Sequence, residues 1–321
     1  MKRFFLTIAI MVVAVCTAQN SYSQGINNRK VVIIKEKDGG KESSKRSYSS
    51  YDESSANMIT RNFEFRGDGI RGIKAGGVFD IQVVKGRSGK VSVTAPEKTM
   101  EHIIVSNTNG IIVLKIENGY NVVNGRSRSV GWLKQRTLKG PIKVKIEGSS
   151  LSKIELSGAA KLVARENYSE DECKIELSGA SQALIDAVKA REIDLDLSGA
   201  SNLRIKTDCD KLDIDMSGAS KLNLECNASI MDSEFGGASN ALIKGEVENV
   251  KIEASGASKC SADNLKIKHL KIDISGASSV NTFVKKSVTG EVSGASSFTY
   301  SGDPDRVIID KSRGSSVKQR Q

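Results

Sequence analysis

A four-residue motif that recurs along the second half of the chain constrains its fold more than any other feature. The motif is Ser-Gly-Ala-Ser or a close variant, and it occurs eight times at intervals of 18 to 21 residues. A period of this length is typical of solenoids, in which every repeat forms one turn of the stack. The motifs begin at Ser157, Ser178, Ser198, Ser217, Gly236, Ser255, Ser275 and Ser293.

The residues on both sides of each motif alternate between apolar and polar. Apolar residues stand three and one places before the motif, as at Ile175 and Leu177, and five and seven places after it, as at Leu203 and Ile205. A spacing of two indicates strands with one buried face. Each unit is therefore predicted to be a strand, a tight bend, a second strand and a variable return.

A two-stranded unit of this size cannot bury its apolar face alone, so consecutive units must stack on one another. The sequence predicts an all-β fold, a parallel β-helix (β-solenoid) with coils of about 20 residues and a less regular N-terminal β cap. Glycine allows the bend, and small neighbours let the coils superimpose. The serines three places after each motif start, from Ser181 to Ser296, are expected to form a ladder of hydroxyl groups.

The first residues indicate export. Lys2 and Arg3 precede an apolar stretch of 12 residues from Phe4 to Val15, which fits a signal peptide and is too short to span a membrane. Residues 1–23 are predicted to be this signal peptide, with cleavage after Ala18 or Ser23. We expect no transmembrane span and a location in the periplasm, at the outer membrane or on the cell surface.

A lipid anchor on Cys16 is disfavoured, because Val15 stands where lipoprotein signals carry a small residue. After the signal peptide, residues 24–58 are predicted to be a disordered polar leader. Residues 59–150 are predicted to form the N-terminal β cap of irregular coils, and residues 151–318 the solenoid repeats with a C-terminal cap.

The residue two places before each motif is always acidic, and we call this column the acidic ladder. Stacked carboxylates repel one another, so the column needs an explanation. The carboxylates could accept hydrogen bonds or pair with Lys174, Lys251 or Lys271; alternatively, they form a strip that binds a cation or a basic partner. The ladder consists of Glu155, Glu176, Asp196, Asp215, Glu234, Glu253, Asp273 and Glu291.

The chain carries a formal net charge of +10, and much of the excess lies before the repeats. No acid occurs between Tyr120 and Lys145, a stretch that also holds the single tryptophan. We call it the basic segment; it is either a solvated loop or a surface that binds an anionic polymer. Its candidate partner-binding residues are Arg126, Arg128, Trp132, Lys134, Arg136 and Lys139.

Several functional classes find no support in the sequence. The two histidines, His102 and His269, are far apart, and no motif for nucleic-acid binding is present. We expect no catalytic residue, cofactor or metal. Cys173, Cys226 and Cys260 occupy inward positions. A disulfide between Cys209 and Cys226, 17 residues apart and close to one coil, is left open for an oxidising compartment, although the two-place offset of their positions in the repeat disfavours it.

The sequence resembles a known family, the putative auto-transporter adhesin, head GIN domain. The resemblance is carried by residues 72–81, which read GIKAGGVFDI, by the repeated motif, and by the closing Gly302-Asp303-Pro304. It implies a β-helical fold and an adhesin role, with no catalytic residues to transfer. The chain has no auto-transporter barrel pattern at its C-terminal end.

Together these observations predict a non-catalytic exported protein of the cell envelope or surface, an adhesin or scaffold. Its expected partner is an envelope polymer, such as a glycan or another anionic surface, or a protein, and homo-oligomerisation is left open. The alternatives are a periplasmic sensor or stress-related envelope component without adhesive activity and, third, a β-helix enzyme that acts on polysaccharides.

Overall fold

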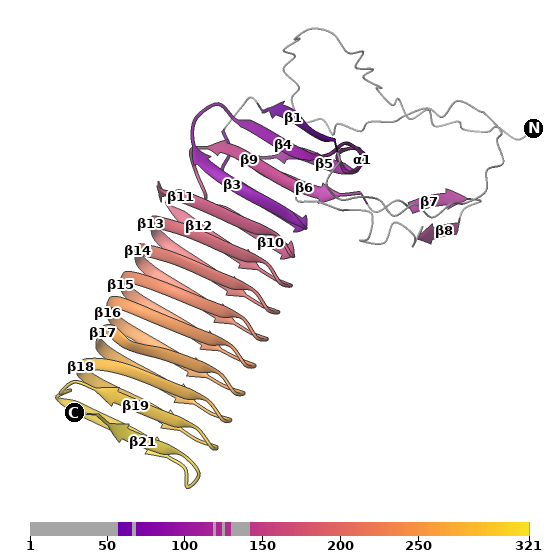
Figure 1. Ribbon diagram of the computed structural model, residues 1–321. Helices are drawn as coiled ribbons and strands as arrows, with labels where there is room; N and C mark the ends of the chain where they lie inside the picture. The colour runs from indigo at the N-terminus through magenta and orange to yellow at the C-terminus, as the bar shows by residue number, and fades with distance from the viewer. Residues whose placement is uncertain (1–56, 66–68, 118–119, 124–125, 130–141, 321) are drawn as a thin grey trace, which may run out of the picture.

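Alternating apolar and polar side chains make every coil a pair of extended segments joined at tight corners. The computed structural model describes residues 57–65, 69–117, 120–123, 126–129 and 142–320. Figure 1 shows them as a rod of stacked strands with a smaller group of strands at the N-terminal end. The predicted signal peptide and nearly all of the predicted leader lie outside the described residues.

The rod is a parallel β-solenoid of about nine turns with coils of about 19 residues, which confirms the predicted fold class. Six strands of 14 to 16 residues each run along both sides of a coil. The repeat strands are β10 (Lys153–Gly158), β11 (Lys161–Ser169), β12 (Glu172–Leu177), β13 (Gln182–Leu197), β14 (Asn202–Met216), β15 (Lys221–Phe235), β16 (Asn240–Ala254), β17 (Lys259–Ile274), β18 (Ser279–Val292) and β19 (Ser297–Ser301).

Consecutive coils pair in parallel with equivalent residues opposite each other. In β14 and β15, for example, Leu222 lies against Leu203 and Met231 against Leu212. The first half of each long strand faces the interior from one sheet and the second half from the other, and both sets are buried. The interior is therefore filled by side chains from every coil, as the period of two predicted.

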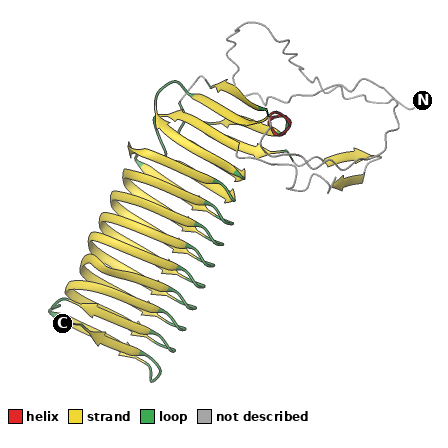
Figure 2. Cartoon of the chain, in the orientation of Figure 1, coloured by secondary structure: helices red, strands yellow, loops and turns green. Residues whose placement is uncertain are grey.

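The repeated motif forms one corner of each coil, drawn as a green turn in Figure 2. Its glycine has a left-handed backbone, with a φ of +67° at Gly218. A Cβ atom at Gly218 would lie 2.6 Å from the carbonyl oxygen of Gly199 in the preceding coil. The amide of Ala219 donates to that same oxygen at 2.7 Å. Glycine is required here both for its conformation and for the close stacking of corners.

The serine column is buried, but its hydroxyls form only part of the predicted ladder. Ser258 Oγ donates to Ser278 Oγ at 3.2 Å, and Ser296 Oγ donates to the carbonyl of Ile274 at 3.4 Å. Among the described residues, the hydroxyls of Ser201, Ser220 and Ser239 have no such partner. Equivalent atoms in adjacent coils are about 4.8 Å apart, which is too far for every serine to reach the next.

All four described cysteines are buried free thiols, as the inward positions of three of them predicted. Cys209 lies opposite Ala228, and Cys226 lies opposite Thr207, so the two thiols are offset by two places. Burial raises the pKa of Cys226 to about 12, which keeps the thiol protonated at neutral pH.

The N-terminal strands extend the solenoid before they close it. Gly76 and Gly77 align with Ser157 and Gly158, so β2 and β3 form a complete coil whose corner does not spell the motif. β6 and β9 add a parallel layer, and β1, β4 and β5 then pair antiparallel. The bounds are β1 (Met58–Glu64), β2 (Gly72–Gly77), β3 (Phe79–Lys85), β4 (Lys90–Pro96), α1 (Glu97–Met100), β5 (Ile103–Thr108), β6 (Ile111–Ile116) and β9 (Ile142–Gly148).

Three further features complete the described fold. A two-stranded hairpin, β7 (Tyr120–Val123) and β8 (Arg126–Ser129), lies between β6 and β9 in the sequence. At the other end of the rod, β20 (Arg306–Lys311) pairs with β18, and β21 (Ser316–Gln319) pairs with β19. The short α1 carries Met100, which is 2% exposed.

Candidate partner-binding face

The acidic ladder forms one column on the outer surface of the sheet built by the strand segments that precede each corner motif. The register places all eight residues directly above one another, from Glu155 opposite Glu176 to Asp273 opposite Glu291. Asp310 lies opposite Glu291 and extends the column by one residue. Asp310 stands two places before Ser312, so the spacing rule would have found it if the last corner, Ser312 to Ser315, had matched the motif.

The N-terminal end of the ladder is neutralised by lysines. Glu155 pairs with Lys153 at 2.7 Å and with Lys74, which lies opposite it on β2. The hydrogen bonds from Lys153 and Lys74 lower the pKa of Glu155 below its ordinary value. These contacts match the first explanation of the column, in which the protein's own cations balance the carboxylates.

Lys174 and Lys251 neutralise two further points on the same face. Lys174 Nζ lies 3.0 Å from Glu176 and 3.2 Å from Asp196, and Lys251 Nζ lies 2.5 Å from Glu253. Among the described residues, no ion pair joins Lys271 to the ladder, although it was one of the three lysines proposed to do so. Lysine pairing therefore accounts for only part of the column.

The middle of the face carries a second acidic column beside the ladder. Asp194 lies opposite Asp213 and Asp213 opposite Asp232, two places before Asp196, Asp215 and Glu234 in their strands. We call these six residues the central acidic block. They line a shallow depression that ends at Lys174 on one side and Lys251 on the other. Within the described part of the chain, only Asp196 and Asp213 have an ion-pair partner.

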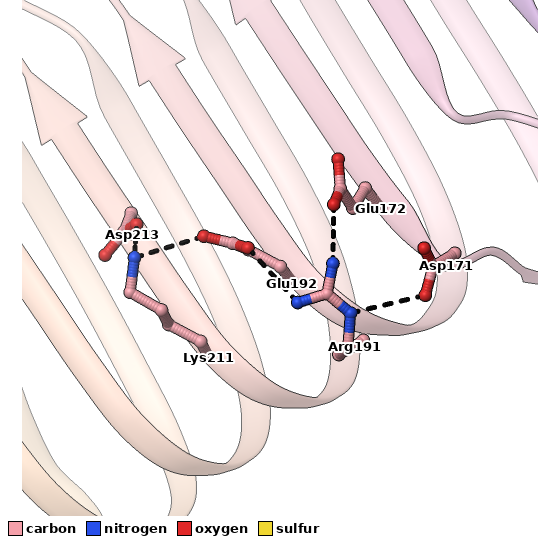
Figure 3. A network of polar contacts seen from close by, with 6 residues as sticks. All are labelled: Asp171, Glu172, Arg191, Glu192, Lys211 and Asp213. Carbon is pink, nitrogen blue, oxygen red and sulfur yellow. Dashed lines mark hydrogen bonds and ion pairs between the residues drawn. The ribbon is translucent and has the colours of Figure 1, made fainter.

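A network of charges lies beside the central acidic block, on the side away from the motif corner. Arg191 reaches Asp171 at 3.3 Å, Glu172 at 2.5 Å and Glu192 at 3.6 Å (Figure 3). Lys211 continues the network by bridging Glu192 at 3.1 Å and Asp213 at 2.5 Å. The network ties together three coils, since its members come from β12, β13, β14 and the turn before β12.

The network also bears on metal binding. Carboxylate oxygens of Glu192, Asp194 and Asp213 lie within 4.8 Å of one another, a spacing that could hold a cation. Lys211 already bridges two of these three groups, and its ammonium donates to both. The electrostatic role of a cation is thus taken by the side chain of Lys211, and the geometry gives no separate reason for a metal.

Asp194 is the block residue whose ionisation the structure opposes most clearly. Burial raises the pKa of its carboxyl above the ordinary value, and the charges of Asp213 and Glu192 raise it further. Lys174 and Lys211 act in the opposite direction. Partial burial is thus the main obstacle to ionisation of Asp194, and the neighbouring carboxylates add to it.

This shift leads to a prediction about Asp194→Asn. A carboxyl whose pKa is higher in the folded than in the unfolded state costs nothing below its unfolded pKa of about 3.9, and it lowers stability as the pH rises through the folded pKa. Asp194→Asn is therefore expected to raise the free energy of unfolding at pH 7 by up to about 1 kcal/mol and to leave it unchanged near pH 3.5. Denaturant unfolding at both pH values measures the difference.

Asp213→Asn is the matched control, because Asp213 is the ion-pair partner of Lys211 and no equivalent gain is expected. An equal gain for Asp194→Asn at both pH values would show that packing rather than charge is responsible.

The basic segment lies in the sequence between β6 and β9, and most of it falls outside the described residues. Lys115 lies opposite Gly76, and Ile142 lies opposite Phe79, so β6 ends and β9 begins beside the Gly76–Gly77 corner of the coil formed by β2 and β3. Arg126 and Arg128 belong to β8. Trp132, Lys134, Arg136 and Lys139 lie outside the described residues, and their role as a partner surface stays a prediction.

These features define a parallel β-solenoid protein with a repetitive, charged outer face. The chain belongs to the family described as "Putative auto-transporter adhesin, head GIN domain", which matches residues 70–241 and 205–304. The family that the sequence resembled is thereby confirmed. A comparison with curated proteins gave no match.

Solved structures with the same fold include proteins from two Parabacteroides species. A putative adhesin from Parabacteroides distasonis ATCC 8503 is similar with a TM-score of 0.60 and 16% identity, covering 83% of this chain and 98% of its own. A putative adhesin from Parabacteroides merdae ATCC 43184 gives 0.56 and 17%, with 82% and 96% covered. A putative lipid binding protein from P. distasonis gives 0.55 and 12%, with 83% and 97% covered. At these identities the likeness concerns the fold.

No helix in the part of the chain that the structure describes combines the length and apolar character needed to cross a lipid bilayer.

Proposed function

We propose that this protein is a non-catalytic, exported adhesin or scaffold of the cell envelope that binds an extended partner along one face of its solenoid. The observation that carries the proposal is the register. It turns one acidic residue per coil into a continuous column and adds a second column across three coils. A repetitive face of this kind suits a partner that is itself extended.

The central acidic block indicates the chemistry of the partner on this face. Asp215, Asp232 and Glu234 have no ion-pair partner among the described residues, so they are available to positive groups. A basic protein segment is the partner that best complements closely spaced, solvated carboxylates. The basic segment, which joins β6 to β9, would contact an anionic polymer instead, such as an acidic glycan.

The packed interior of the solenoid argues against lipid binding inside the rod. A solved structure with this fold is named a putative lipid binding protein. In this chain, inward side chains such as Leu224 and Ile252 are fully buried. The interior is filled by these side chains, so a lipid would have to bind on the outside of the rod.

Loss of the block should weaken binding of a cationic probe. For the triple variant Asp215→Asn, Asp232→Asn and Glu234→Gln, we expect about tenfold weaker binding of a fluorescent oligolysine peptide at low salt, since each exposed pair is worth about 0.2–1 kcal/mol. Fluorescence anisotropy measures the dissociation constant.

The control removes the same number of charges elsewhere, in Asp208→Asn, Asp210→Asn and Glu246→Gln. All three residues are exposed and lie outside the block. Equal weakening in both variants would mean that net charge, and not this face, determines binding, and the proposed face would be wrong.

A second test addresses the basic segment and the non-adhesive alternative. Replacing residues 118–141 by a short linker keeps β6 and β9 intact, so the first coil should still fold. We expect the intact mature protein to bind acidic glycans on an array and the shortened protein to lose that signal. If the intact protein bound neither the glycans nor oligolysine, an adhesive role would be contradicted.

A further inference from the structure

The two ends of the rod are finished in different ways. At the N-terminal end, β1, β4 and β5 change the pairing to antiparallel, and α1 buries Met100. At the C-terminal end, β20 pairs only with β18 among the described residues, so its other edge has unpaired backbone groups. Val307 and Ile308 on this strand are 42% and 48% exposed.

Val307 is exposed because no described strand pairs with the outer edge of β20. Val307 lies opposite Val288, which is 0% exposed in the interior of the preceding coil. Ile309 occupies the next inward position and is only partly buried. Among residues 57–320 that the structure describes, nothing covers the apolar interior at this end, and an open apolar edge is a place where another strand can add.

The sequence of β20 is complementary to itself when two copies run antiparallel about Ile308. Arg306 of one copy then lies opposite Asp310 of the other, and Val307 lies opposite Ile309 on the interior side. Just beyond the strand, Asp305 would lie near Lys311. Opposite charges and apolar pairs that face each other across strands are stabilising.

The register shifted by half a residue is less favourable. Moving the centre by half a residue toward Ile309 places Arg306 opposite Lys311 and Val307 opposite Asp310. That arrangement sets like charges together and buries a carboxylate against an apolar side chain. Of these two registers, antiparallel pairing centred on Ile308 is the one that places opposite charges together.

We infer that the C-terminal end of the rod binds a second copy of this chain through antiparallel pairing of β20 with β20 about a two-fold axis at Ile308. The result is a tail-to-tail dimer in which the open interiors of the two solenoids meet. This arrangement leaves the acidic ladder of each copy on the outside. It also directs the two N-terminal ends away from each other, as a two-fold contact between rod ends requires.

The test compares the mass of the mature protein in solution with that of charge variants. Analytical ultracentrifugation should show a concentration-dependent dimer. Arg306→Asp alone would set two carboxylates opposite each other and is expected to raise the dissociation constant at least tenfold. The double variant Arg306→Asp and Asp310→Arg restores opposite charges and should restore the dimer.

Two further variants separate the proposed contact from other causes. Ile308→Cys should give a disulfide-linked dimer on non-reducing gels, because the symmetric position brings the same residue of both copies together. Ile230→Cys, at a 43% exposed position in the middle of the rod, should not. A mature protein that stays monomeric at high concentration, or a dimer that Arg306→Asp leaves unchanged, would overturn the inference.

Discussion

Replacing Gly237 by alanine is expected to lower the free energy of unfolding by about 2–4 kcal/mol. Gly237 has a φ of +67°, a conformation that an L-residue adopts only with strain. An added Cβ would also lie 2.6 Å from the carbonyl oxygen of Gly218 in the preceding corner. Backbone atoms cannot move apart there without breaking the corner stack. Denaturant unfolding followed by circular dichroism measures the loss.

The adjacent Gly236 provides the control within the same corner. Its φ is not in the left-handed region, and the nearest atom to an added Cβ is the carbonyl oxygen of Met216 at 3.6 Å. Most other corners have serine at this position. Gly236→Ala should therefore be neutral or stabilise by about 0.4–1 kcal/mol, by restricting the unfolded chain. Equal losses at both glycines would contradict the account of the corner.

The second large effect is expected for Phe235→Ala, at about 3–5 kcal/mol of lost stability. Phe235 is almost fully buried and lies between Met216 and Ala254 in the interior column. The column accommodates the ring because the next coil supplies only a methyl group at Ala254. Truncation leaves a cavity that the rigidly spaced coils cannot close.

Ile230→Ala on the same strand separates burial from side-chain size. Ile230 is exposed, so its truncation should change stability by less than about 0.5 kcal/mol. Each coil contacts only its neighbours, so hydrogen exchange in Phe235→Ala should accelerate most in β14, β15 and β16. A uniform acceleration along the rod would show that the solenoid unfolds as one unit.

The fold of the repeats follows from local rules that are visible in the chain. The alternation around Ile175 and Leu177 requires a strand, and the glycine of each motif requires a bend. The acidic ladder could be aligned correctly because its register depends only on distance from the motif. The first coil escaped this reasoning, since its corner at Gly76 and Gly77 shares the geometry but not the letters.

The candidate site was predictable only in part. The ladder has one acid in every repeat, whereas the second column is acidic only at Asp194, Asp213 and Asp232 and carries lysine or threonine in the other repeats. A column that changes composition does not stand out as a repeat. The three aspartates are recognised as one acidic cluster only when the strand register shows that they lie opposite one another in adjacent coils. Likewise, α1 has four residues and β21 follows a divergent corner, so neither produced a periodic signal.

By itself the sequence determined the shape of a coil, its stacking in parallel and the column to which each repeat residue belongs. These properties depend on side-chain period and on glycine at fixed intervals, both of which act over a few neighbouring residues. Only the tertiary structure decided which carboxylates remain unpaired and which end of the rod is open. Charge balance depends on neighbours in the same strand and on residues about 20 positions away, and edge exposure depends on which coil lies alongside; only stacking brings the distant groups together.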